Sequence, residues 1–267
     1  MFKLSKKLTV ILCSTMISFP CALAGQKKVN LNQVTAKTPR SQAAVKEIIL
    51  SEFKKELSNK EVMSLKKQVL SYSGKAIPAL IDVMKTGTYP DKNRWVATFL
   101  VGRIMGKKSS PFLAKFLKHP NWVLRMASLK TLLALKEKKY SSLYGKALSD
   151  NSFIVRKQAL DNIRLLEAQD QAPYVWSMLY DKRNYYAPKD GSKKRTNLIK
   201  QAIRTVGELK FDKAKKPLLS MIQKDKYKDI YNAIDYSLSK ITGKKSPEDH
   251  AMKMRFWKKM AIAEKTF

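Results

Sequence analysis

Asp150-Asn151-Ser152-Phe153-Ile154-Val155-Arg156-Lys157-Gln158-Ala159-Leu160 is the stretch of sequence that decides the fold. The arginine of this stretch recurs at Arg94, Arg125 and Arg156. Its alanine, replaced once by serine, recurs at Ala97, Ser128, Ala159, Ala202 and Ala233. Successive members lie 31 residues apart (156 − 125 = 31), except for one step of 43 before Ala202 (202 − 159 = 43). Self-similarity at a fixed period is the signature of a repeat protein.

Each repeat contains two apolar patterns with the spacing of a helix. The second pattern continues from the repeated alanine through Val101, Leu132, Ile163 and Val206. Upstream lie sets such as Leu113, Phe116 and Leu117, whose spacing places apolar side chains on one helical face. Prolines open several of the first helices, at Pro78, Pro111, Pro173 and Pro217. Pro78 and Pro111 lie 33 residues apart (111 − 78 = 33), so the first repeat has two residues more than the period of 31. We place these two additional residues in the turn from Lys85 to Asp91.

A single helix pair cannot bury its apolar face, so neighbouring pairs must stack and share one core. The sequence therefore predicts an all-α fold, an α-solenoid of about five helix pairs with helical caps at both ends. Residues 43–75 are the predicted N-terminal cap, 76–245 the repeats and 246–267 a C-terminal capping helix. We expect Phe256, Trp257 and Met260 to face the core from that last helix.

The quoted stretch resembles the HEAT-repeat family, particularly its short bacterial variety of the PBS-lyase type. Asp150, Val155-Arg156 and Ala159-Leu160 match the aspartate, valine-arginine and alanine-leucine of that pattern, and residues 202–209 resemble the end of its second helix. The resemblance implies an inter-repeat ladder of aspartates and arginines. His119 replaces the aspartate in the second unit and Ile199 replaces the arginine in the fourth, which interrupts such a ladder.

The first segment has the pattern of an export signal. Three lysines are followed by the apolar run from Leu8 to Phe19 and by Ala22-Leu23-Ala24, where small residues suit a signal peptidase. We expect residues 1–24 to be a signal peptide cleaved after Ala24, residues 25–42 to be a flexible leader, and the mature chain to be periplasmic or secreted. No later stretch has the roughly 20 apolar residues of a transmembrane helix.

Both cysteines, Cys13 and Cys21, lie inside the predicted signal peptide. The mature chain is therefore expected to have no thiol, which removes disulfides, cysteine nucleophiles and thiolate metal sites together. Ser18-Phe19-Pro20 is a poor sequence before a lipidated Cys21, so we do not expect a lipoprotein.

The chain is strongly basic, with 54 Lys and Arg against 21 Asp and Glu and a formal net charge of +33. Such an excess favours anionic partners. Because most of it is lysine, it indicates general attraction to polyanions more than shaped recognition of one phosphate. A lysine-rich surface that serves only solubility explains the same composition.

Two sets of residues are candidate binding sites. The longer step of 43 reflects an expansion from Asp181 to Arg195, with basic and aromatic candidates at Lys182, Arg183, Tyr185, Tyr186, Lys193, Lys194 and Arg195. Insertions into repeat arrays form loops, often on the binding face, although a tolerated surface loop is an equal alternative. The second set is the row two before the repeated alanine, with candidates Lys157, Lys200 and Tyr231; we assign Trp95 and Met126 of this row to the core.

No catalytic motif, phosphate-binding glycine loop or metal-ligand cluster is present in the sequence, so we expect neither an enzyme nor a cofactor. The leading hypothesis is an exported, non-catalytic scaffold of the cell envelope that binds a protein partner. The alternative is a polyanion binder, with nucleic acid, anionic lipid or an acidic envelope polymer as ligand. A remote alternative is an alkylpurine DNA glycosylase built of HEAT-like repeats, although no catalytic aspartate with flanking tryptophans can be matched.

Overall fold

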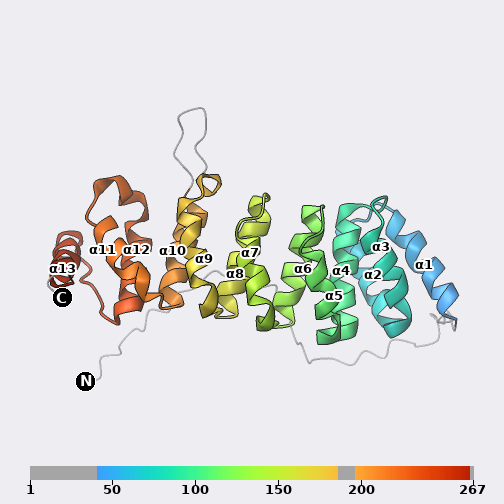
Figure 1. Cartoon of the computed structure of the whole chain (residues 1–267). Helices are drawn as coiled ribbons and strands as arrows, with labels where there is room; N and C mark the ends of the chain where they lie inside the picture. The colour runs from blue at the N-terminus through green and yellow to red at the C-terminus, as the bar shows by residue number, and fades with distance from the viewer. Residues whose placement is uncertain (1–40, 186–195, 265–267) are drawn as a thin grey trace, which may run out of the picture. The chain divides into compact units, whose positions relative to one another are not determined.

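The computed structural model describes residues 41–185 and 196–264, and within them every regular element is an α-helix or a short 3-10 helix (Figure 1). The predicted signal peptide, most of the predicted leader and residues 186–195 of the Asp181–Arg195 expansion lie outside the described residues. The α-helices are α1 (Gln42–Lys54), α2 (Asn59–Ser71), α3 (Ile77–Lys85), α4 (Asp91–Met105), α5 (Ser110–Phe116), α6 (Trp122–Ala134), α7 (Ser141–Ala147), α8 (Phe153–Leu165), α9 (Ala172–Ser177), α10 (Asn197–Glu208), α11 (Lys215–Met221), α12 (Tyr231–Thr242) and α13 (His250–Ala263).

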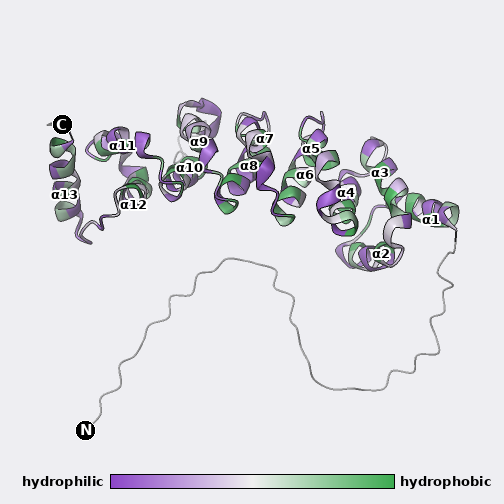
Figure 2. Cartoon of the chain, turned by 60° about the horizontal axis from the view of Figure 1, so that its bottom comes forward, coloured by the Kyte–Doolittle hydropathy of each residue, from purple (hydrophilic) through white to green (hydrophobic). Residues whose placement is uncertain are grey.

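The all-α repeat architecture predicted from the sequence is confirmed. Helices α3 to α12 form pairs in chain order, and Figure 2 shows the first helices (α3, α5, α7, α9, α11) in one row and the second helices (α4, α6, α8, α10, α12) in another. Each second helix contacts the next one along the chain. At the N-terminal end α1 packs on α3 and α2 on α4, and at the C-terminal end α13 packs on α11.

Proline marks the start of several first helices, whereas α7 begins at Ser141 without one. Pro78, Pro111 and Pro173 occupy the first turn of α3, α5 and α9, where a missing amide hydrogen removes no helical hydrogen bond. We expected the two additional residues of the first repeat to lie in the turn from Lys85 to Asp91, and this expectation is wrong. The turns after α3 and after α5 both have five residues, and α3 has nine residues where α5 has seven.

Three second helices, α6, α8 and α10, end in the same turn, which the sequence pattern does not predict. Lys136, Glu167 and Lys210 adopt positive φ, which is the conformation that glycine normally supplies at a helix end. The next residue in each case donates its amide to a carbonyl five residues earlier, as Ala168 does to Ile163. The backbone thus repeats even where the side chains at the key position are long and charged.

The core runs through the whole described array. Ala159 and Leu160 of the quoted stretch are fully buried, as are the equivalent Ala202 and Ile203. Trp257 of α13 is also fully buried and donates its ring nitrogen hydrogen to Asp235 of α12 at 2.8 Å. Phe256 and Met260 are partly buried against the same core, as predicted.

Candidate binding surface on the second helices

The turns between first and second helices are held by one repeated side-chain contact. His119 Nδ1, Asp150 Oδ1 and Asp181 Oδ1 lie at successive steps of 31 residues, and each accepts the backbone amide two residues further on, at 3.0, 2.8 and 2.9 Å. Short polar side chains favour this local turn. His119, which departs from the aspartate pattern, therefore performs the same local role through a ring nitrogen.

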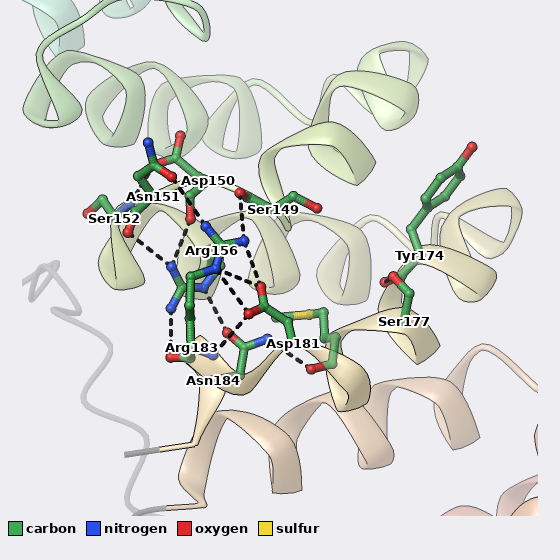
Figure 3. Close-up of polar contacts among 11 residues, drawn as sticks. Ser149, Asp150, Asn151, Ser152, Arg156, Tyr174, Ser177, Asp181, Arg183 and Asn184 are labelled. Carbon is green, nitrogen blue, oxygen red and sulfur yellow. Dashed lines mark hydrogen bonds and ion pairs between the residues drawn. The ribbon is translucent and has the colours of Figure 1, made fainter. Parts of the chain in front are cut away.

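The repeated arginines use their guanidinium groups inside the protein. Arg125 donates to both oxygens of Asp150 in the next repeat at 2.7 Å and to two carbonyls of its own turn. Arg156 donates to Asn184 Oδ1 at 2.7 Å, to the Arg183 carbonyl, and to the carbonyls of Asp150 and Asn151 (Figure 3). The Arg125–Asp150 pair is one contact of the inter-repeat kind that the resemblance implies, and Arg156 reaches the next repeat through Asn184. Arg94 instead donates to the Met84 carbonyl and to Asp91 of its own repeat.

The expansion changes the partner of Arg156. By its spacing Asp181 corresponds to Asp150, yet it pairs with Arg183, whose guanidinium lies 2.7 Å from Asp181 Oδ2 (Figure 3). These hydrogen bonds lower the pKa of the Asp181 carboxyl, whereas burial lowers the pKa of Arg156. Asn184 then takes the place of the aspartate. The ladder ends here, because Ile199, buried in the core, stands where the next arginine would be.

Of the expansion's seven candidates, three lie in the described residues. Arg183 also reaches back to Asn151 Oδ1 and the Ser149 carbonyl, so it joins two repeats. Tyr185 is half-buried and donates its hydroxyl to the Leu179 carbonyl, and burial raises its pKa. Lys182 is exposed. The candidates Tyr186, Lys193, Lys194 and Arg195 lie outside the described residues.

The residues of the predicted row on the second helices do not share one environment. Lys157 is exposed and lies 3.1 Å from Asp161, and Lys200 lines a groove on the same face. Tyr231 instead stacks on His250 of α13, with ring centroids 6.1 Å apart. Trp95 and Met126 are partly buried against the core, consistent with the assignment we made.

Two grooves meet at Arg164 on the second helices. The groove between α6 and α8 has a volume of about 430 Å³, and its apolar wall includes Leu133, Ala134 and Leu165. The groove between α8 and α10 has a volume of about 390 Å³ and is lined by Arg164, Asn197, Lys200, Gln201, Arg204 and Glu208. Arg164 lines both, so the two form one surface, which we call the second-helix groove.

Cations lie over aromatic rings at several places along the array. Arg204 and Lys240 lie 5.2 and 5.5 Å from the ring centroid of Tyr236. Lys130 lies 5.8 Å from the ring of Trp95, and Lys66 lies 5.4 Å from that of Phe99. Such pairs hold a flexible cation over an apolar surface. Lys130 and Arg204 line the groove itself, so two of these pairs keep positive charge there.

The carboxylates of the second-helix groove are engaged by neighbouring side chains. Asp161 accepts from Gln201 at 2.5 Å and pairs with Lys157, and it lies 3.9 Å from Arg164. Glu208 accepts from the Tyr236 hydroxyl at 3.1 Å. Burial and the nearby Glu208 raise the pKa of Tyr236, so this phenol remains protonated at neutral pH. The groove therefore offers cations and amides together with two fixed carboxylates.

Sequence reasoning missed Arg164, Gln201, Arg204 and Tyr236. Arg204 lies one helical turn after the predicted Lys200, so extending the row by four residues would have found it. Gln201 and Tyr236 carry no such signal, because their roles depend on which residues the neighbouring helices bring opposite them.

Among the described residues, no three His, Cys, Asp or Glu side chains gather into a possible metal site. In the same part of the chain, no helix combines the length and apolarity needed to cross a membrane. No protein-family model and no curated protein matches the chain.

Proposed function

We propose that the protein is a non-catalytic binding scaffold of the cell envelope, and that it holds an extended acidic segment of a partner protein in the second-helix groove. The observation that carries the proposal is the junction of two grooves at Arg164, one with an apolar wall and one with basic and amide side chains. The export pattern of residues 1–24 supports a place in the envelope.

The mixed chemistry of the groove favours a peptide segment. Leu165 is 54% exposed and provides an apolar surface beside the basic groove. Gln201 and Asn197 offer amide groups that match a peptide backbone. Asp161 and Glu208 place negative charge at fixed points of the groove. A uniform chain of phosphates would be repelled at these points, whereas a peptide can place an apolar or amide group there.

The test uses a fluorescent peptide rich in glutamate with leucine at every third position, measured by anisotropy with the full chain. Replacing Arg164 and Arg204 by glutamine should weaken binding by about tenfold or more, because hydrogen bonds to charged groups contribute about 1.5–3 kcal/mol each. Lys107→Gln with Lys108→Gln, on exposed residues of the turn after α4, is the matched control and should change nothing.

Leu165→Ser tests the apolar wall at an exposed position and should also weaken peptide binding. Equal affinity of the wild type, the Arg164/Arg204 variant and Leu165→Ser would overturn the proposal. So would a loss of affinity of the same size in the Lys107/Lys108 control, since binding would then follow total charge and not the groove.

The second candidate function is polyanion binding, favoured by the formal charge of +33 and by the cation–aromatic pairs at Trp95, Phe99 and Tyr236. It predicts that oligothymidylate binds more tightly than the peptide and loses affinity steeply between about 50 and 200 mM salt. Replacing Lys182, Lys193, Lys194 and Arg195 by glutamine should then weaken oligothymidylate binding. Weak, salt-insensitive binding of oligothymidylate would exclude it.

A further inference from the structure

A separate groove lies at the C-terminal end of the described array, between α11 and α13. It has a volume of about 500 Å³, within the usual size range of small-molecule sites. Its apolar lining comes from Leu219, which is almost wholly buried, and from Ala261 and Ile262 of α13. It shares no residue with the second-helix groove, so an occupant here is independent of the function proposed above.

Three ammonium groups border this apolar lining. Lys216 and Lys224 come from α11 and the turn after it, Lys258 comes from α13, and all three are exposed. Glu264 is the carboxylate among the described lining residues, and its Oε1 lies 2.9 Å from Lys215 Nζ, outside the lining. That contact raises the pKa of Lys215. No ion pair joins the three bordering lysines to a carboxylate within the described part of the chain.

An apolar lining with cations at its border matches a ligand that has an alkyl chain and an anionic end. The alkyl chain would lie along Ile262, whose side chain is 58% exposed, so binding would remove this apolar surface from water. Flexible lysines adapt to a carboxylate head without the fixed two-pronged geometry that arginine imposes. We infer that the α11–α13 groove binds a single-chain anionic amphiphile of the fatty-acid type, taken up as a monomer.

The test is calorimetric titration of the full chain with dodecanoate below its micelle concentration. Shortening the chain to decanoate should weaken binding by roughly fourfold for each methylene that is buried. Lys216→Gln with Lys258→Gln should weaken dodecanoate binding about tenfold, since two charge-assisted contacts are lost. Ile262→Asp places a negative charge where the alkyl chain of the anionic ligand would lie, so it should abolish binding. The position is 58% exposed, so the variant should still fold.

Lys107→Gln with Lys108→Gln is again the matched control and should bind dodecanoate as the wild type does; thermal unfolding checks that each variant is folded. Equal binding of decanoate and dodecanoate, or of uncharged dodecyl maltoside, would overturn the inference. Binding of inorganic phosphate with the same affinity would reduce the site to a simple anion site. Binding to phosphatidylglycerol vesicles without binding of monomeric dodecanoate would replace it with contact at a bilayer surface.

Discussion

Asp150 connects two neighbouring repeats through one carboxylate. It accepts both prongs of Arg125 from the preceding repeat while it holds its own turn through the Ser152 amide. The Arg125 and Asp150 side chains are only 14% and 11% exposed, so solvent screens this ion pair far less than a surface pair. The contact therefore joins local turn geometry to the packing between repeats.

Removing this carboxylate should destabilise the array. We expect Asp150→Ala to lower the free energy of unfolding by about 2–4 kcal/mol, because Arg125 would be left partly buried without its charge partner. Urea unfolding followed by circular dichroism measures the change. Asp212→Ala removes a carboxylate that is 78% exposed beside Lys215 and should stay within about 0.5 kcal/mol of the wild type. Similar losses in both variants would refute the special role of Asp150.

His119 gives the turn before α6 a dependence on pH. Burial and the nearby Arg94 and Arg125 lower its pKa, and its Nδ1 accepts the Asn121 amide, which requires an unprotonated nitrogen. In the unfolded chain a histidine titrates near pH 6.5. The stabilisation by neutral His119 is therefore fully present above that value and is lost as pH falls through it toward the lower pKa of the folded state.

Between pH 8 and pH 5.5 the wild type should lose more free energy of unfolding than His119→Asn. Asparagine keeps an acceptor for the Asn121 amide and does not titrate. Urea unfolding at the two pH values gives the difference. The pKa values of Glu61, Asp170 and Asp181 are lowered in the folded state, so these groups titrate below this window. An identical pH dependence of the two proteins would contradict this assignment.

At the scale of elements, the close approach of α10 and α12 depends on a glycine. A methyl group added at Gly207 would lie 2.5 Å from the Ser237 Cα, which is backbone and cannot rotate away. Gly87, in the turn between α3 and α4, has no heavy atom within 4 Å of such a methyl group. Comparing alanine substitutions at these two glycines therefore distinguishes the effect of helix packing from the intrinsic preference of the backbone.

Gly207→Ala should lower the free energy of unfolding by about 1–3 kcal/mol through overpacking. This loss is expected even though alanine favours an isolated helix over glycine by about 1 kcal/mol. Gly87→Ala should change stability by less than about 0.5 kcal/mol. Both are measured as shifts of the urea midpoint at constant slope. A stabilised Gly207→Ala variant would show that α10 and α12 are less tightly packed than the structure has them.

At the scale of the whole molecule, the formal charge of +33 opposes compaction. Adding NaCl from about 10 to about 100 mM shortens the screening length from about 30 to about 10 Å. Stability against urea should rise over this range, because repulsion among many lysines outweighs exposed pairs such as Lys46–Asp82, each worth at most about 1 kcal/mol. A fall in stability with salt would mean that local ion pairs dominate.

The sequence by itself determined the repeat period, the helix pairs, the prolines at helix starts and the burial of Trp257. These features follow from periodicity within one helix, where side chains three and four residues apart share a face whatever lies opposite. The placement of five stacked pairs also followed, since an apolar face on every helix requires neighbours.

Only the tertiary structure decided which residues meet across repeats. In the structure Arg156 donates to Asn184, and Asp181 pairs with Arg183. The spacing of 31 residues, which matches Asp181 with Asp150, would have made Asp181 the partner of Arg156. The tertiary structure also joined Arg164 and Gln201 around Asp161 into one groove. The physical reason is that these contacts link residues of neighbouring elements, so they depend on the offset and angle at which two helices pack. Those quantities are set by the sum of many side-chain contacts, which no single stretch of sequence contains.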